Sequence, residues 1–160
     1  MRHSITTGFS FGLTSGVITT LGLLVGLNSG THSKLVVIGG ILTIAIADAF
    51  SDALGIHISE EAEGKHTARE IWIATISTFL SKFLFASSFL IPIFFLPLYH
   101  AVFVSIVYGL ILIVVFSYIL ARVQGKNVIK VIFEHLLIFS FVIISASFRN
   151  FCSSSISFNW

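Results

Sequence analysis

The sequence predicts an all-α integral membrane protein, a bundle of five transmembrane helices. Hydrophobic residues make up 56% of its 160 residues and charged residues only 10%, and the mean hydropathy is +1.02. A soluble domain of this size needs more charge to cover its surface. The apolar runs lack the alternating pattern of barrel strands, so helices are the structure that satisfies their backbone groups in lipid.

Five apolar runs follow one another, each near or above the roughly 20 residues that cross a hydrocarbon core. They are residues 9–27, 35–58, 71–98, 101–120 and 128–148. The first run follows Arg2, as in a signal peptide, but it is rich in glycine and lacks a small-residue cleavage site, so we expect it to stay. The chain has no repeat and no Pro- or Ser-rich linker, so residues 1–160 are predicted to form a single transmembrane domain.

Glycines recur along the first run, mostly at every fourth position. They are Gly8, Gly12, Gly16, Gly22 and Gly26. A helix face of this kind lets another helix backbone approach closely. Two interpretations stay open: packing within the chain, or a seam that joins two subunits of a homodimer.

The third run is too long for one minimal span. Residues 71–98 would measure about 42 Å as a straight helix. Pro92 and Pro97 predict a kink or a termination near the outer end of this run. After the fourth run, the segment 125–127 (Gly-Lys-Asn) predicts a tight turn.

The distribution of basic residues predicts the orientation in the membrane. With a cytoplasmic N-terminus, the inside segments hold Arg2, Lys65, Arg69, Arg122, Lys126 and Lys130, and the outside segments hold only Lys34 and Arg149. The positive-inside rule therefore favours a cytoplasmic N-terminus and an external C-terminus. We expect a multi-pass protein of the plasma membrane of a prokaryotic cell.

Two acidic residues lie inside the second run. Asp48 and Asp52 are four residues apart and share one helix face. An acidic residue in the bilayer interior costs at least about 2.5–3.5 kcal/mol, so such residues usually mark a pathway. Lys82 in the third run is predicted at the same depth as Asp48. Two interpretations stay open: an Asp48–Lys82 ion pair that leaves Asp52 freer, or a lysine that loses its proton as a cation enters.

Hydroxyl groups of the first run are further pathway candidates. Thr14 and Ser15 are the residues that we include, although they, like Thr19 and Thr20, can instead bond carbonyls of their own helix. His57 is interpreted as a hydrogen-bonded interfacial histidine. The pair Glu134-His135 is interpreted as snorkelling toward the membrane surface.

A second polar group follows the second run. Its members are Glu60, Glu63, His66 and Glu70, spaced by three, three and four residues. On a continuous helix they would line one side, and helical bundles use a Glu-x-x-His spacing to bind iron or manganese. Oxygen and imidazole ligands suit these metals. A solvated acidic helix end is the alternative interpretation. The single cysteine, Cys152, excludes an internal disulfide and a thiolate cage.

Three segments resemble the vacuolar iron transporter family. They are residues 11–26 (FGLTSGVITTLGLLVG), 47–55 (ADAFSDALG) and 59–63 (SEEAE); the later helices resemble the family more loosely. The resemblance implies a five-helix protomer, a homodimer joined around the first helices, and export of ferrous iron or related cations from the cytosol in exchange for protons.

The chain departs from the family pattern at three positions. Ser15 stands where members usually have aspartate, Asp52 where they have methionine, and Ile56 where they have glutamate. We interpret Asp48 and Asp52 as carboxylates that replace the missing ones from adjacent turns.

These observations predict a dimeric, proton-coupled exporter of iron(II) or manganese(II). The acidic residues after the second run would collect the cation and pass it to Asp52 and Asp48. The metal is cargo, and no resident cofactor is expected. Alternatives are a membrane metal sensor or scaffold that does not transport, and a proton-coupled transporter of a small organic solute. The sequence has no nucleophile and base at a suggestive spacing and no basic stripe, so neither an enzyme nor a nucleic-acid partner is expected.

Overall fold

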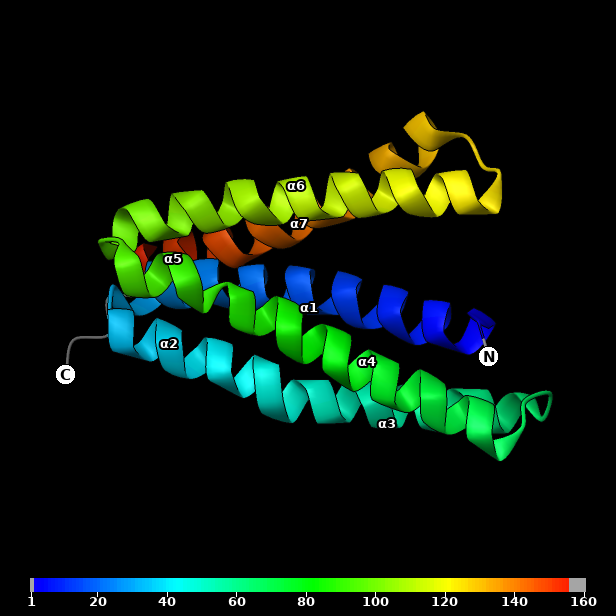
Figure 1. Ribbon diagram of the computed structural model, residues 1–160. Helices are drawn as coiled ribbons and strands as arrows, with labels where there is room; N and C mark the ends of the chain where they lie inside the picture. Colours follow the sequence, from blue (N-terminus) through cyan, green and yellow to red (C-terminus); the bar gives the residue numbers. More distant parts are fainter. Residues whose placement is uncertain (1, 156–160) are drawn as a thin grey trace. The chain divides into compact units, whose positions relative to one another are not determined.

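A computed structural model describes the backbone of residues 2–155 and the side chains of residues 4–147 (Figure 1). Every regular element in that part of the chain is a helix, so the predicted all-α class is confirmed. The elements are α1 (Arg2–Thr31), α2 (Lys34–Thr43), the π-helix η1 (Ile44–Asp48), α3 (Ala49–Glu63), α4 (Ala68–Ser88), α5 (Leu90–Phe95), α6 (Leu98–Gln124) and α7 (Val128–Ser155). The side chains of Arg2, Arg149 and Cys152 lie outside the described ones.

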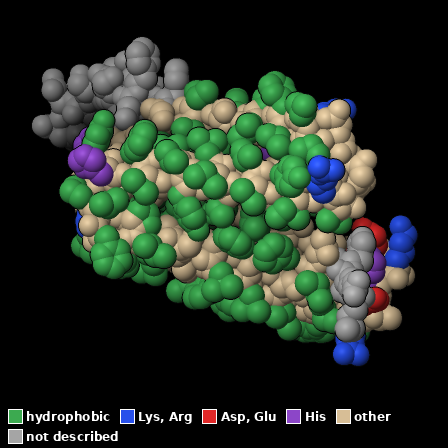
Figure 2. Space-filling view, turned by 45° about the horizontal axis from the view of Figure 1, so that its top comes forward, with side chains coloured by type: hydrophobic (Ala, Val, Ile, Leu, Met, Phe, Trp, Pro, Cys, Tyr) green, Lys and Arg blue, Asp and Glu red, His purple; other side chains and the backbone are tan. Residues whose placement is uncertain are grey.

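Five stretches within the described residues are long and apolar enough to cross a membrane. They are Ser4–Thr31, Lys34–Glu63, Ala68–Phe95, Leu98–Gln124 and Val128–Ser147. Large hydrophobic side chains such as Leu35, Phe95 and Ile129 are mostly exposed, and in Figure 2 hydrophobic side chains cover much of the visible face. A surface of this kind fits lipid rather than water, so the chain is a multi-pass membrane protein.

The long third run is interrupted as its prolines predict. Helix α4 ends at Ser88, and α5 begins at Leu90. Pro92 has no N–H to donate to the carbonyl of Ser88, and its ring clashes with that carbonyl, so the α4 ladder cannot continue. Pro97 then stands at the N-cap of α6. The predicted kink or termination near the outer end of this run is confirmed as a termination.

Two helix turns use glycine in the left-handed region. Gly64 ends α3 with a φ of 63°, and Gly125 ends α6 with a φ of 64°. These φ values favour glycine because it has no Cβ. The next helix is capped in both cases: Thr67 forms a capping box with Glu70, and Asn127 Oδ1 accepts the N–H of Ile129 at 3.0 Å. The predicted turn at residues 125–127 is confirmed.

The chain divides into two compact units. The first holds Met1–Thr20 and Gly39–Ile91, and the second holds Leu21–Ile38 and Pro92–Trp160. In the first unit, buried alanines bring the helices close together. Buried residues of this unit include Leu13, Val17, Ala45, Ala49, Ala53 and Ala74. In the second unit, α6 and α7 bury Ile113, Phe116, Ala121, Val131 and Phe139.

The glycines of α1 pack against α4 of the same chain. A Cβ atom at Gly8 would lie 2.2 Å from the carbonyl oxygen of Ala74, and one at Gly12 would lie 2.4 Å from that of Thr78. One at Gly16 would lie 3.2 Å from the carbonyl oxygen of Lys82. The contacts advance along both helices together, so α1 and α4 run parallel, and internal packing uses this part of the glycine face.

The last two glycines of the face differ from the first three. A Cβ atom at Gly22 would meet Val142 at 3.0 Å, and one at Gly26 would meet nothing within 4 Å. Internal packing therefore uses four of the five glycines, and a Cβ atom at Gly26 meets no neighbour in the described residues. The predicted subunit seam and homodimer formation stay predictions.

Candidate functional site: a buried lysine between two aspartates

The side chain of Lys82 is completely buried, with an exposed fraction of 0%. Its Nζ lies 2.6 Å from Asp48 Oδ2 and 2.5 Å from Asp52 Oδ2. It also donates to Ser15 Oγ at 3.0 Å. We call these four residues the lysine cluster. Asp48 and Lys82 were predicted to lie at one depth, and this expectation is confirmed.

Helix packing in the first unit brings the cluster together. Helices α3 and α4 form an antiparallel hairpin (Figure 1), so residues far from the turn on one helix face residues far from it on the other. Asp48, the last residue of η1, and Asp52, one turn later, both reach Lys82. Ser15 arrives from α1, where the missing side chain of Gly16 lets the backbone lie against Lys82.

Ser15 completes the cluster as a hydroxyl. It donates to Asp52 Oδ2 at 2.6 Å while accepting from Lys82. Asp52 Oδ2 therefore accepts two hydrogen bonds. The expectation that Asp52 would be the freer carboxylate is wrong: its side chain is 20% exposed, against 34% for Asp48. Asp48 is the more open of the two because α1 contributes its hydroxyl to Asp52.

The cluster satisfies the hydrogen-bonding capacity of the ammonium. A lysine ammonium has three N–H donors, and Asp48, Asp52 and Ser15 supply three acceptors. Two carboxylates and one ammonium leave one net negative charge. The ammonium is therefore surrounded by oxygen atoms, which are the ligands that hard divalent cations prefer.

The predicted capture residues Glu60, Glu63, His66 and Glu70 do not lie on one continuous helix. Gly64 ends α3, and Glu70 folds back to accept from the N–H and the hydroxyl of Thr67 at 3.1 Å and 2.9 Å. The prediction that four metal ligands line one side of a single helix is therefore wrong, because the left-handed glycine and the capping box redirect the chain.

Three members of that group do converge. His66 Nε2 lies 3.4 Å from Glu60 Oε2 and 4.0 Å from Glu63 Oε2. Glu60 Oε2 is buried and has no aligned hydrogen bond, since the 3.4 Å contact is an ion contact only. No set of three His, Cys, Asp or Glu side chains among the described residues is arranged to hold a metal ion as it stands.

Hydroxyls of α1 outside the cluster follow the sequence expectation only in part. Thr19 donates to the carbonyl oxygen of Ser15 at 2.7 Å, as expected for a hydroxyl that bonds its own helix. The hydroxyl of Thr20 is buried and has no hydrogen-bond partner, so that expectation is wrong for Thr20. Among the described residues, Thr14 makes no polar contact with the lysine cluster.

Two histidines contact hydroxyl groups that were not predicted from the sequence as their partners. His57 Nδ1 lies 2.9 Å from Thr75 Oγ1, and His135 Nδ1 lies 2.7 Å from Ser117 Oγ. The partners are 18 residues apart in both cases, on the two arms of a helical hairpin. The hydrogen bond expected for His57 is confirmed. His135 is held by Ser117 instead of merely snorkelling. The turn glycines Gly64 and Gly125 could have predicted both pairs, because each pair joins residues on opposite sides of one of these turns.

The sequence matches no protein-family model and no curated protein. The resemblance to the vacuolar iron transporter family in residues 11–63 therefore stays a prediction, as do the roles that it implies.

Proposed function

We propose that this protein exchanges protons for a divalent metal cation, iron(II) or manganese(II), across the membrane, and exports the metal from the cytosol. One observation carries the proposal: a fully buried ammonium sits between two carboxylates and a hydroxyl. Ionisable groups inside membrane spans are costly and usually mark ion pathways or proton relays. The lysine cluster is the proposed exchange site.

The proposed exchange balances in charge. With Lys82 protonated, the cluster carries one net negative charge. When a divalent cation enters and Lys82 releases one proton, two carboxylates, a neutral amine and the metal sum to zero. The neutral amine then becomes a further ligand.

The acidic turn is the proposed point of metal capture. Glu60, Glu63 and His66 approach one another at this end of α3, and the buried Glu60 carboxylate oxygen lacks a hydrogen bond. Glu63 is 52% exposed and, among the described residues, has only long ion contacts, with Lys65 at 3.9 Å and His66 at 4.0 Å, so its carboxylate can turn toward a cation. Asp48, the more open carboxylate of the cluster, would receive the metal next. In a homodimer, each copy would carry a complete cluster.

Metal flux in proteoliposomes tests the proposal. The purified protein is reconstituted with a metal-sensitive dye inside, and manganese(II) uptake is followed under an imposed pH gradient. The wild type is expected to show saturable uptake with counter-movement of protons. Asp48→Asn/Asp52→Asn is expected to abolish both. Unchanged flux in the double variant would contradict the route, and tight metal binding without flux would favour a sensor.

Lys82→Met separates an exchange site from a purely structural cluster. In the wild type the apparent metal affinity should rise about tenfold per pH unit while Lys82 is protonated, because one proton is released per metal bound. In Lys82→Met this pH dependence should disappear. The variant leaves buried carboxylates without their partner and should be destabilised by about 3–5 kcal/mol, and added metal should restore its thermal stability.

Lys34→Met is the matched control for the removal of a lysine. Lys34 Nζ donates to the carbonyl oxygens of Phe94 and Leu96, both at 3.2 Å, and takes no part in the cluster. Its pH dependence of metal affinity should equal that of the wild type. A destabilised Lys82→Met protein that no metal rescues would show that the cluster only holds the helices together.

A further inference from the structure

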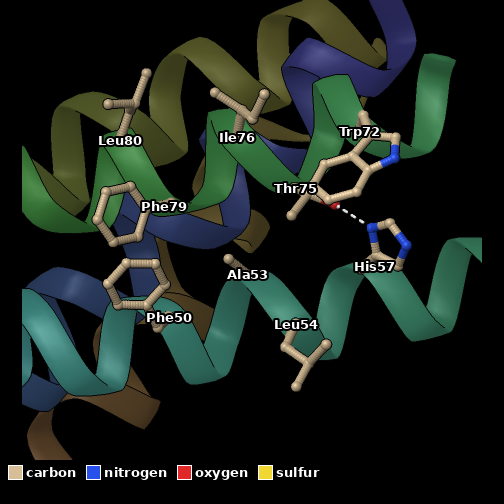
Figure 3. Close-up of a pocket in the computed structure, with 9 residues that line it drawn as sticks. All are labelled: Phe50, Ala53, Leu54, His57, Trp72, Thr75, Ile76, Phe79 and Leu80. Atoms are coloured by element: carbon tan, nitrogen blue, oxygen red, sulfur yellow. Dashed lines mark hydrogen bonds between the residues drawn. The ribbon is translucent and has the colours of Figure 1, made fainter.

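A groove of about 390 Å³ runs along the outer face of the α3–α4 hairpin (Figure 3). Phe50, Phe79 and Leu80 line one end, and His57, Thr75 and Trp72 line the other. Between the two ends, the lining is aliphatic. Several lining side chains, Trp72 and Leu54 among them, are more than half exposed. On a membrane-spanning hairpin, this face meets lipid.

The two ends of the groove differ in polarity. At the end far from the turn, the rings of Phe50 and Phe79 lie 4.5 Å apart. At the end near the turn, the His57 and Trp72 rings meet edge-on at 4.8 Å. Trp72 is the fifth residue of α4, about 6 Å from the helix start, which is a depth where tryptophan marks the membrane interface.

The hydrogen bonds fix how His57 presents itself. Thr75 uses its single hydroxyl proton to bond the carbonyl oxygen of Ile71 at 2.8 Å. Thr75 Oγ1 can therefore only accept from His57, whose Nδ1 must carry the hydrogen. The other ring nitrogen, Nε2, keeps its hydrogen-bonding capacity, so the groove has a polar anchor at one end alone.

One carboxylate and one guanidinium flank the polar end. Glu61 follows His57 by four residues on α3, and Arg69 precedes Trp72 by three residues on α4. These spacings place each of them on the helix face that lines the groove. Both side chains are exposed. Together they present one negative and one positive charge beyond the polar end of an apolar slot.

We propose that this groove binds a zwitterionic aminophospholipid. One acyl chain lies in the slot, the headgroup phosphate contacts Arg69, and the headgroup ammonium contacts Glu61. The proposal commits to a phospholipid because the slot is apolar along its length and its single polar end lies at interface depth. It commits to an amine headgroup because the flanking charges are one of each sign.

The single tryptophan near the groove provides a direct test. The chain has two tryptophans, so Trp160→Phe leaves Trp72 as the only tryptophan, which is excited selectively over the tyrosines. Phosphatidylethanolamine with brominated acyl chains is titrated into this protein in detergent, and quenching of Trp72 is recorded. Saturation at one lipid per chain is expected. Quenching that only rises in proportion to lipid would identify ordinary annular lipid and would overturn the proposal.

A matched pair of substitutions shows whether quenching reports the groove. Ile76 lines the slot and Leu84 does not, yet both are exposed aliphatic residues of α4. Ile76→Phe obstructs the slot and should weaken binding about tenfold. Leu84→Phe should leave the titration unchanged. Identical curves for the two variants would overturn the proposal, as would absence of quenching together with cross-linking of a second copy through this face.

Two charge variants test the headgroup. Arg69→Gln should weaken binding of both phosphatidylethanolamine and phosphatidylglycerol about threefold, since both have a phosphate. Glu61→Gln should weaken phosphatidylethanolamine binding by a similar factor and leave phosphatidylglycerol unaffected or improved, since only the former has an ammonium. A loss of equal size for both lipids in Glu61→Gln would contradict the assigned headgroup.

Discussion

At the residue scale, Lys82 shows how a charge is tolerated at the centre of a membrane helix. Its ammonium is fully buried, and its three donors meet two carboxylates and a hydroxyl. Such a cluster is costly to assemble, because each ion must leave water, and costly to break, because the remaining ions lose their partner. In the proposed exchange, a divalent cation takes the place of the ammonium between the same oxygen atoms.

Gly12 illustrates how little space separates α1 from α4. A Cβ atom there would lie 2.4 Å from the carbonyl oxygen of Thr78 and 2.0 Å from Ser81 Oγ, far inside van der Waals contact. Backbone cannot yield as a flexible side chain does, so the helices would have to separate. The glycine face thus positions Ser15 and Lys82 for their contact.

We predict that Gly12→Ala lowers the free energy of unfolding by about 2–3 kcal/mol because of this overlap. Gly39→Ala in α2 is the control: a Cβ there meets nothing within 4 Å, so the gain in helix propensity should stabilise by up to about 1 kcal/mol. Thermal unfolding in detergent measures both. Equal melting temperatures for the two variants would contradict the close packing of α1 on α4.

At the element scale, the π-helix η1 keeps one side of the second span facing its neighbours. Ile41, Ala45, Ala49 and Ala53 are buried at a strict spacing of four. In an α-helix of 3.6 residues per turn, a stripe with this spacing drifts steadily around the axis. The wider turn of a π-helix offsets part of that drift. It ends at Asp48, so the extra residue helps to hold both aspartates toward Lys82.

Deletion of Ala47, an exposed residue of η1, should be tolerated. The π turn accommodates one additional residue, so its removal should restore a plain α-helix without rotating the flanking segments. Deletion of Leu54 from α3 should instead rotate the rest of that helix by about 100° and prevent folding. Monodispersity in detergent and the melting temperature would distinguish them, and equal damage from both deletions would speak against this role of η1.

At the scale of the whole molecule, the basic residues predict one orientation. The turns after α3 and α6 hold Lys65 and Lys126, whereas the turn after α1 precedes Lys34. Lys34 also bonds the carbonyl oxygens of Phe94 and Leu96, so it has a structural partner as well as a charge. The positive-inside rule therefore predicts a cytoplasmic N-terminus.

Cysteine labelling in intact cells checks this orientation. In a Cys152→Ser background, Ser33→Cys should react with a membrane-impermeant maleimide added outside, and Lys126→Cys should react only after the cells are opened. Ser33 is half-buried and Lys126 is exposed, so burial alone would favour labelling at Lys126, the opposite of the expected contrast. The reverse pattern of labelling would invert the proposed direction of transport.

Much of the fold was predictable because its determinants are local along the chain. The bilayer dictates the length of each apolar run, Pro92 removes a specific backbone donor, and the glycine at position 125 marks a turn. The contact between Asp48 and Lys82 was predictable for a similar reason. The depth of each residue follows from its distance in sequence to the same short turn.

The sequence by itself determined that the chain forms five membrane-crossing helices and carries two aspartates and a lysine inside them. Only the tertiary structure decided that Ser15 binds Asp52 across 37 residues of chain, that Asp48 is the more open carboxylate, and that Glu70 caps its own helix. Hydropathy and residue spacing predict which side chains share a face of one helix, but not which side chains of different helices meet. Which hydroxyl, carboxylate and ammonium share a site depends on how closely separate helices pack, and here the side chains absent at Gly12 and Gly16 set that distance.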